Sequence, residues 1–245
     1  MSSEIRLEMN GSVCRIVLNA PSRRNALRPD MLAALQGAVQ AAQDAGNAAR
    51  VVVLQAEGPV FCAGFDLKQC AAEDGVLESL LEGLAEVITG LRNIGVPTIA
   101  AVRGAAVAGG CALLGGADFV IAHPETKLGY PVLRIGVSPA VSGPSLSQAV
   151  GAGGARRLLL DPSLISAPRA EALGLLHELS PDPESAAETL AANLAGKPGG
   201  GVAATRRWLD ELVPLDRQPA ALAASLRITR TPERRRMLDD VWSSR

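Results

Sequence analysis

The 245-residue sequence has few aromatic side chains and no excess of charge of either sign. Phe, Trp and Tyr make up 2% of the residues, so Ala, Val, Leu and Ile must fill the core. The 24 basic and 25 acidic residues leave a formal net charge of −1. This balance argues against a nucleic-acid surface built on bulk electrostatics, and we expect no nucleic-acid partner.

Long apolar runs and paired cysteines are missing as well. No stretch reaches the roughly 18 uncharged apolar residues that a membrane span needs, so we expect no membrane partner. The N-terminal segment lacks the apolar stretch of a secretory signal. The four cysteines form no CxxC pair, which is typical of buried thiols in a reduced compartment. We therefore predict a cytoplasmic protein.

Signatures of metal, dinucleotide and serine-nucleophile sites are also missing. The only histidines are His123 and His177, and no HExxH motif or Cys/His cluster occurs, so we predict no metal. No GxSxG motif is present, and the glycines at 151–154 do not form GxGxxG after a strand. Cys62 could act as a nucleophile, but no histidine is close in sequence to activate it, and a buried structural thiol is the commoner role.

Apolar patterning predicts alternating strands and helices. Short apolar or β-branched runs predict strands at 13–18, 51–54, 98–102 and 119–122. Apolar residues at helical spacing predict helices at 31–42 and 76–91, and glycines open a short helix at 109–114. This alternation is typical of the α/β class, with parallel strands joined by crossovers.

The C-terminal third has a different character, because helices dominate after Gly143. We divide the chain into a core, residues 1–195, and a helical C-terminal region, residues 196–245. We expect this region to pack on a neighbouring subunit through an apolar face made of Leu226, Met237, Leu238, Val241 and Trp242.

Two glycine-containing turns are the strongest functional signal. The segments 61–68 (FCAGFDLK) and 108–111 (AGGC) each follow a predicted apolar strand. Their small residues leave backbone N–H groups accessible to a ligand. Gly109 and Gly110 open a helix whose first N–H groups have no internal acceptor. Two such amides aimed at one point would stabilise an oxyanion, although either turn alone is also an ordinary strand-to-helix connection.

With these turns, a wider set of motifs resembles the enoyl-CoA hydratase/isomerase (crotonase) superfamily over residues 10–180. The set comprises NAL at 25–27, FCAGFDLK, AVAGGCAL, LGYP at 128–131, IGVSP at 135–139, and ISA at 165–167 followed by ALGL at 172–175. The resemblance implies a spiral of ββα units with a helical C-terminal trimerisation region. It also implies an acyl-CoA substrate, no cofactor other than the CoA of that substrate, and trimers or dimers of trimers.

The resemblance also assigns site residues by position. It implies that the thioester oxygen is held by the backbone N–H groups of Ala63 and Gly109. Arg24, Ala26 and Lys68 fall where the family contacts the nucleotide end of CoA, although Arg24 and Lys68 could equally be solvated surface charges. The other substrate contacts that it implies are at Asp66, Leu67, Gly110, Val132 and Ser138.

Two positions depart from the hydratases of that family. Ala112 and Val132, 20 positions apart, stand where those enzymes carry the two glutamates that position and activate water. A methyl and an isopropyl group transfer no proton, so we do not expect efficient hydration. Tyr130 is a candidate replacement, with pocket lining as its alternative role, and Ser138 and Ser142 are turn residues that could also reach the site.

We therefore predict an acyl-CoA enzyme of the lyase or isomerase class, in fatty acid metabolism, that stabilises a thioester enolate. Isomerisation, decarboxylation and thioester hydrolysis all remain open. The alternative is a non-catalytic acyl-CoA-binding protein or partner subunit.

Overall fold

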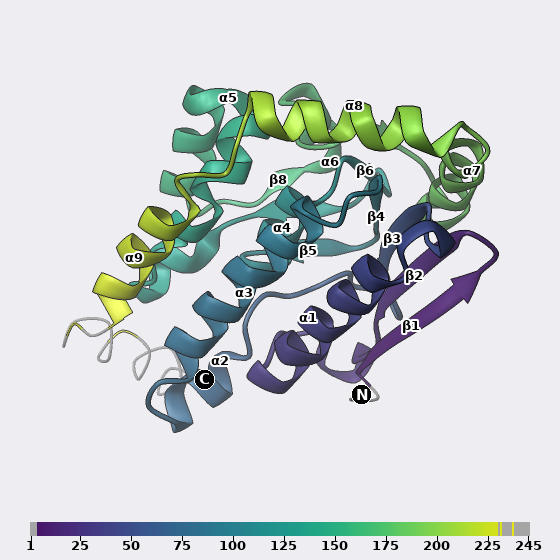
Figure 1. Ribbon diagram of the computed structural model, residues 1–245. Coiled ribbons are helices and arrows are strands. Elements are labelled where there is room, and N and C mark those ends of the chain that lie inside the picture. The colour runs from purple at the N-terminus through teal and green to yellow at the C-terminus, as the bar shows by residue number, and fades with distance from the viewer. Residues whose placement is uncertain (1–3, 230, 232–236, 238–245) are drawn as a thin grey trace.

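The computed structural model describes residues 4–229, 231 and 237, and a six-stranded sheet forms its centre (Figure 1). The strands follow the order β1 (Ile5–Asn10), β2 (Val13–Leu18), β3 (Val51–Ala56), β4 (Thr98–Val102), β6 (Phe119–Ala122), β9 (Glu178–Leu179). The strands from β2 onward are parallel, as the α/β pattern predicted, and β1 pairs antiparallel with β2. The sequence did not predict β1, an edge strand that is largely exposed and polar in pattern.

Helices cover both faces of this sheet. Alternate residues of β3 face opposite sides, so Val52 and Leu54 belong to the main core, while Val51 and Val53 pack in a smaller cluster under α7 (Pro183–Ala195). On the main side, α1 (Pro29–Asp44) and α3 (Val76–Arg92) lie against each other (Figure 1). Their apolar faces are buried as the helical spacing predicted.

A second, three-stranded sheet gives the fold its spiral course. It consists of β5 (Ala105–Val107), β7 (Lys127–Gly129) and β8 (Ile165–Ser166), in that order. Single bridges from Cys62 to Ala106 and from Leu27 to Phe65 extend the same layer. The chain thus passes repeatedly from the large sheet to the small one, which is the spiral of ββα units that the resemblance implied.

The remaining helices connect these layers. They are α2 (Leu67–Ala72), α4 (Gly109–Leu113), α5 (Gly143–Leu160), α6 (Ala167–Ala172), and the single-turn helices η1 (Pro21–Arg23), η2 (Gly46–Ala48), η3 (Leu114–Gly116), η4 (Pro131–Ile135) and η5 (Pro139–Ser142). Non-helical torsions at Gly151 (φ 70°, ψ 162°) divide α5 into two segments. Within the described ranges, no helix combines the length and apolarity that a membrane crossing requires.

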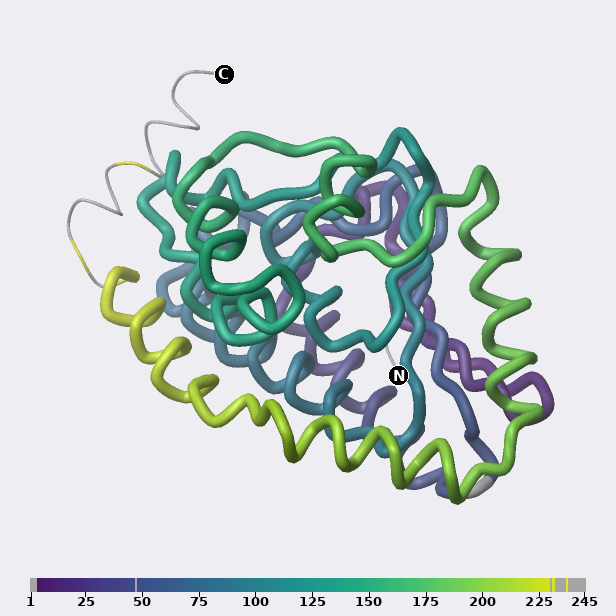
Figure 2. The backbone as a smooth tube through the Cα atoms, turned by 90° about the horizontal axis from the view of Figure 1, so that it is seen from above, coloured from purple at the N-terminus to yellow at the C-terminus, as the bar shows by residue number. Residues whose placement is uncertain are grey.

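The part of the C-terminal region that the structure describes is largely helical, as predicted. The helices α8 (Gly199–Leu212) and α9 (Gln218–Thr229) follow α7 around the edge of the core (Figure 2), and α9 packs on α3 and η5. Of the predicted apolar face, Leu226 packs against the core. Met237 is half-buried, whereas Leu238, Val241 and Trp242 lie outside the described residues.

Candidate active site

A cavity of about 330 Å³ lies where the turn after β3, helix α3, the start of α4, and the turns η4 and η5 meet. Its wall is mostly apolar, because α3 presents Leu77, Leu81 and Leu84 to it and η5 presents Pro139 and Val141. The segments 61–68 and 108–111 both reach this cavity. The structure therefore brings together the two glycine turns that the sequence singled out.

Gly64 makes the close approach of the two turns possible. Its φ is +92°, a conformation that residues with a Cβ rarely adopt. A Cβ at this position would lie 3.0 Å from the carbonyl oxygen of Val107 and 3.2 Å from the Cβ of Ala108. The first turn is therefore packed directly against the backbone that leads into α4.

The prediction that the Ala63 N–H is an oxyanion donor is wrong. Its N–H donates to the carbonyl oxygen of Arg24 at 3.0 Å and is not available to a ligand. The N–H of Phe65, two residues later, has no acceptor among the residues that the structure describes. An amide left unpaired beside a cavity is a candidate ligand donor, so Phe65 takes the place of Ala63.

Pairing between segments 24–27 and 63–66 explains this difference. Leu27 donates to the carbonyl oxygen of Gly64 at 2.7 Å, and Asp66 donates to that of Leu27 at 2.8 Å. These bonds form a parallel bridge between Leu27 and Phe65. The bridge uses the carbonyl group of Gly64 as acceptor and the N–H of Asp66 as donor, so the Phe65 N–H points away from the neighbouring segment.

The second predicted donor, Gly109, lies at the first position of α4, and its N–H has no acceptor within the described part of the chain. Ala108, just before it, has a φ of 50° and a ψ of −112°, which is strained for a residue with a Cβ. A Cβ on Gly109 would lie 3.0 Å from Cε1 of Phe65, so the two candidate donors belong to adjacent residues in space.

Tyr130 is a deeply buried polar residue of the cavity wall, with 2% of its surface exposed. Its hydroxyl is hydrogen-bonded to the side chains of Cys111 and Ser142. Burial, reinforced by Cys111, raises the pKa of Tyr130 well above 10. The phenol therefore stays protonated at neutral pH and can donate a hydrogen bond or a proton.

Carboxylates are missing from the described lining of this cavity, and so are histidine and lysine. Its one charged lining residue in the described ranges is Arg134. Val132 lines the cavity as predicted, whereas Ala112 is buried in the core and does not. Ser138 and Ser142 also line it, and the hydroxyl of Ser138 caps η5 by accepting from the N–H of Ala140 at 3.4 Å.

Comparison with known proteins identifies the family. A family model for enoyl-CoA hydratase/isomerase matches residues 8–235. The chain belongs to the enoyl-CoA hydratase/isomerase family. A crystal structure of an enoyl-CoA hydratase/isomerase from Mycobacterium paratuberculosis superposes with a TM-score of 0.89 at 28% identity, over 98% of this chain and 99% of that one. The crotonase fold that the motifs implied is thereby confirmed.

Relatives of known sequence include members from animals and fungi. The human enoyl-CoA hydratase domain-containing protein 3, a mitochondrial protein, is 35% identical over 177 residues, which cover 71% of this chain and 58% of the human protein. The enoyl-CoA isomerase/hydratase fer4 of Mycosarcoma maydis is 34% identical over 186 residues, covering 71% of this chain and 67% of that protein. This chain thus spans less than two thirds of the human relative's length.

The residues expected to contact CoA differ in their relation to the cavity. Leu67 lines the cavity, whereas Arg24, Ala26 and Lys68 do not. Arg24 and Lys68 are exposed on the two segments that pair beside Phe65. Their contact with the nucleotide end of CoA stays a prediction.

Two further predicted contacts have structural roles. Asp66 caps α2, because its carboxylate accepts from the N–H groups of Lys68 at 3.1 Å and Gln69 at 3.4 Å. Gly110 permits close packing, since a Cβ there would lie 2.4 Å from the carbonyl oxygen of Cys62. Neither residue lines the cavity.

The buried thiols do not provide a nucleophile at neutral pH. Burial raises the pKa of Cys62 to about 12 and that of Cys111 to about 11. Both side chains are therefore protonated thiols rather than thiolates. Within the described ranges, no group of three or more His, Cys, Asp or Glu side chains could hold a metal ion.

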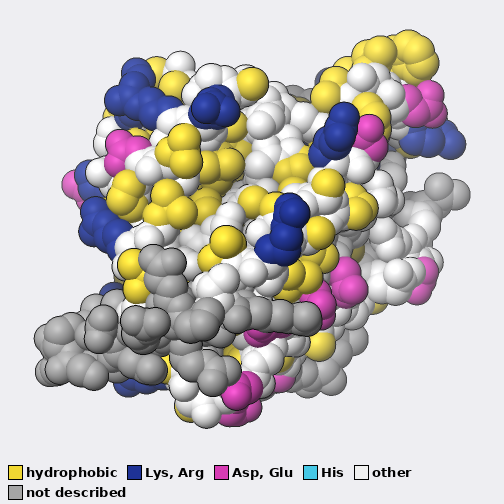
Figure 3. Space-filling model, turned by 90° about the vertical axis from the view of Figure 1, so that its left-hand side faces the viewer, with side chains coloured by type: hydrophobic (Ala, Val, Ile, Leu, Met, Phe, Trp, Pro, Cys, Tyr) yellow, Lys and Arg dark blue, Asp and Glu magenta, His cyan; other side chains and the backbone are white. Residues whose placement is uncertain are grey.

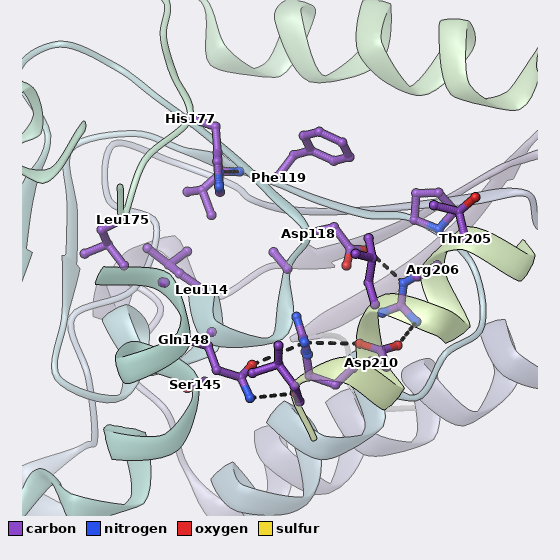
Figure 4. A pocket seen from close by; sticks show the side chains of 18 of the residues that line it. Leu114, Asp118, Phe119, Ser145, Gln148, Leu175, His177, Thr205, Arg206 and Asp210 are labelled. Atoms are coloured by element: carbon purple, nitrogen blue, oxygen red, sulfur yellow. Dashed lines mark hydrogen bonds and ion pairs between the residues drawn. The ribbon is translucent and has the colours of Figure 1, made fainter. Parts of the chain in front are cut away.

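A second cavity, of about 770 Å³, lies behind the first, between α4, α5 and α8 (Figure 4). Ion pairs cross one side of it: Arg206 contacts Asp118 at 2.9 Å and Asp210 at 3.1 Å, and Arg92 contacts Asp210 at 3.1 Å. His177 also lines it, and its Nδ1 accepts from the N–H of Val120 at 2.9 Å. No sequence pattern predicted this cavity.

Proposed function

We propose that this enzyme binds an acyl-CoA thioester in the 330 Å³ cavity, with the thioester oxygen between the N–H groups of Phe65 and Gly109. Two unpaired main-chain donors on adjacent residues support this proposal, together with the family of the chain. Negative charge that develops on the oxygen would be stabilised there, and removing one such donor typically slows a reaction by about 10²–10³-fold.

The make-up of the cavity wall favours one class of reaction. Hydration needs a base that activates water, and isomerisation needs a base that removes a proton from carbon. Among the described lining residues there is no carboxylate, imidazole or amine to serve as that base, but there is a protonated phenol, Tyr130. This single observation carries our choice of reaction.

We infer that the enzyme decarboxylates acyl-CoA thioesters that carry a carboxylate on the α-carbon, such as malonyl-type substrates. The bond between the α-carbon and the carboxylate breaks, carbon dioxide leaves, and the electron pair passes to the thioester as an enolate. The enolate oxygen lies between the two amides. Tyr130 then delivers its proton to the α-carbon, and the resulting phenolate recovers a proton from water.

A panel of thioesters tests this proposal. Malonyl-CoA, methylmalonyl-CoA, crotonyl-CoA and butyryl-CoA are incubated with the purified protein, and the products are separated and quantified. We expect carbon dioxide and the shortened acyl-CoA from the first two and no efficient hydration of crotonyl-CoA. Rapid hydration by the unaltered protein would contradict the assignment.

A second candidate function is acyl-CoA binding without catalysis. The two apolar residues at the positions of the hydratase glutamates, Ala112 and Val132, favour it. The same panel separates the candidates, because this one predicts saturable binding of every thioester with no product. The double variant Ala112→Glu with Val132→Glu is a further test of the scaffold, and hydration of crotonyl-CoA by it would show that only the proton-transfer groups were missing.

We further propose that the C-terminal region takes part in self-association as a trimer or a dimer of trimers. Hydrophobic side chains gather on the face that carries α5 and α9 (Figure 3), and the exposed hydrophobic residues of the C-terminal region include Trp208, Leu209, Leu212 and Ile228. Sedimentation velocity gives the mass of the particle and so tests the proposal. The cytoplasmic location and the role in fatty acid metabolism stay predictions.

A further inference from the structure

Tyr130 separates the two cavities. Among the described residues, it is the only one that lines both the 330 Å³ cavity and the 770 Å³ cavity behind it. Its side chain is almost wholly buried, so protein atoms and the two cavities surround the ring. Tyr130 is therefore the residue at which the small cavity and the larger one adjoin.

The Tyr130 side chain is hydrogen-bonded to residues of both cavity walls. The Tyr130 hydroxyl is hydrogen-bonded to Ser142, which lines the small cavity, and to Cys111, which lines the large one. Ser145 continues the wall, because it lines the large cavity and its hydroxyl donates to the carbonyl oxygen of Ser142 at 3.3 Å. These contacts hold the Tyr130 side chain in place between residues of the two cavity walls.

The space behind the ring has an apolar side and a charged side. Figure 4 shows Leu114 and Leu175 on one side of the large cavity and the ion pair of Asp118 with Arg206 on the other. Leu146, a buried core residue, also belongs to the lining. An aliphatic chain that passed the position of Tyr130 would thus enter a chamber more than twice as large, with apolar side chains available to cover it.

We propose that Tyr130 sets the acyl-chain length that the enzyme accepts. With the ring in place, the small cavity must hold the thioester and the whole acyl group, so the substrates are short-chain acyl-CoAs. Without the ring, a long aliphatic chain extends into the large cavity. This inference rests on the proposed binding of acyl-CoA in the small cavity, and it adds the size class of the acyl group.

Titration calorimetry with saturated thioesters tests the inference, since butyryl-, octanoyl- and dodecanoyl-CoA bind without reacting. For the unaltered protein and for Tyr130→Phe, which keeps the ring, we expect no gain in affinity beyond the butyryl chain. For Tyr130→Ala, affinity should rise with chain length, by about fourfold for each additional methylene that is buried. Tyr130→Leu serves as a second variant, because removing so large a buried side chain risks unfolding the protein.

A variant that fills the large cavity is the matched control for Tyr130→Ala. Leu146→Trp placed in the Tyr130→Ala background should occupy the large cavity and restore the preference for short chains. Tight binding of dodecanoyl-CoA by the unaltered protein, or an equal gain in Tyr130→Phe, would overturn the inference. Failure of butyryl-CoA to bind any of the proteins would instead overturn the proposed acyl-CoA function, so the two failures are distinguishable.

Discussion

The N–H of Ala63 donates to the carbonyl oxygen of Arg24 at 3.0 Å. This bond and the bridge between Leu27 and Phe65 hold the segment 24–27 against the first glycine turn. The pairing uses the N–H groups of Ala63 and Asp66 and the carbonyl group of Gly64, and it leaves the Phe65 N–H for a ligand. The proposed oxyanion site therefore depends on main-chain hydrogen bonds from a segment that lies about 80 residues before α4 in the sequence.

Gly64→Ala should slow turnover of the thioester that the panel identifies by about 10²–10³-fold, as expected for loss of an oxyanion donor. The added Cβ would press on the backbone of Val107 and displace Phe65 from Gly109. Gly75→Ala is the matched control, because Gly75 also has a positive φ, +85°, but open space around it. Both variants carry similar backbone strain, so equal effects on kcat would contradict the site.

Tyr130→Phe should lower kcat by about 10²–10⁴-fold with little change in KM, since it removes the proton donor and keeps the ring. The donor is active in its protonated form, and the pKa of Tyr130 is raised well above 10. The rate of the unaltered enzyme should therefore not decline through deprotonation of Tyr130 at any pH below about 10. Full activity of the phenylalanine variant, measured across pH, would exclude Tyr130 as the acid.

Arg206→Met should destabilise the fold by about 3–5 kcal/mol, the usual cost of breaking a buried ion pair from one side. Arg206 is 6% exposed, pairs with Asp118 and Asp210, and donates to the carbonyl oxygen of Leu91 at 3.2 Å. Arg6→Met is the control, because the side chain of Arg6 is 41% exposed where it pairs with Glu8, and such pairs contribute about 0–1 kcal/mol. Similar urea midpoints for both variants would show that the buried network contributes little.

The buried thiols should make the fold less stable in alkali. The folded-state pKa values of Cys62, about 12, and Cys111, about 11, exceed the value near 8.5 expected in the unfolded chain. The folded state therefore holds protons that the unfolded state releases, and stability present below about pH 8.5 is lost as the pH rises through 11–12. Urea unfolding between pH 7 and pH 10 measures this loss, and Cys62→Ala should reduce it.

Titration with a thiol reagent tests whether the cysteines are buried in the folded protein. All four cysteines are buried and none of them forms a disulfide, so a thiol reagent at neutral pH should modify none of them in the folded protein and all of them after unfolding. Rapid modification of Cys62 in the native state would contradict its assignment as an inert core thiol and reopen it as a nucleophile.

Sequence patterns predicted the strands and helices that are buried and regular. The predicted limits of β2, β4 and β6 agree with the structure, because these runs are apolar or β-branched and end at turns. The short strands β5, β7 and β8 were not predicted, since two or three residues carry no measurable alternation. Their pairing depends on partners distant in sequence.

At the candidate site, the structure brings together the segments that the sequence singled out, but the amide of Ala63 is paired with Arg24. The sequence indicated that the two glycine turns meet, and it indicated that Tyr130 reaches the site. It could not indicate which amide of the first turn is left unpaired, because that depends on the bridge from Leu27 to Phe65. The place of Tyr130 between the two cavities was equally hidden, since the cavity behind it is formed by α5 and α8, which follow much later in the chain.

A crystal structure with a stable acyl-CoA analogue tests the central claim most directly. We expect the thioester oxygen at about 3 Å from the backbone nitrogens of both Phe65 and Gly109, the distance of a good N–H···O hydrogen bond. A thioester oxygen bound elsewhere, or an Ala63 amide that leaves Arg24 to bind it, would contradict the account.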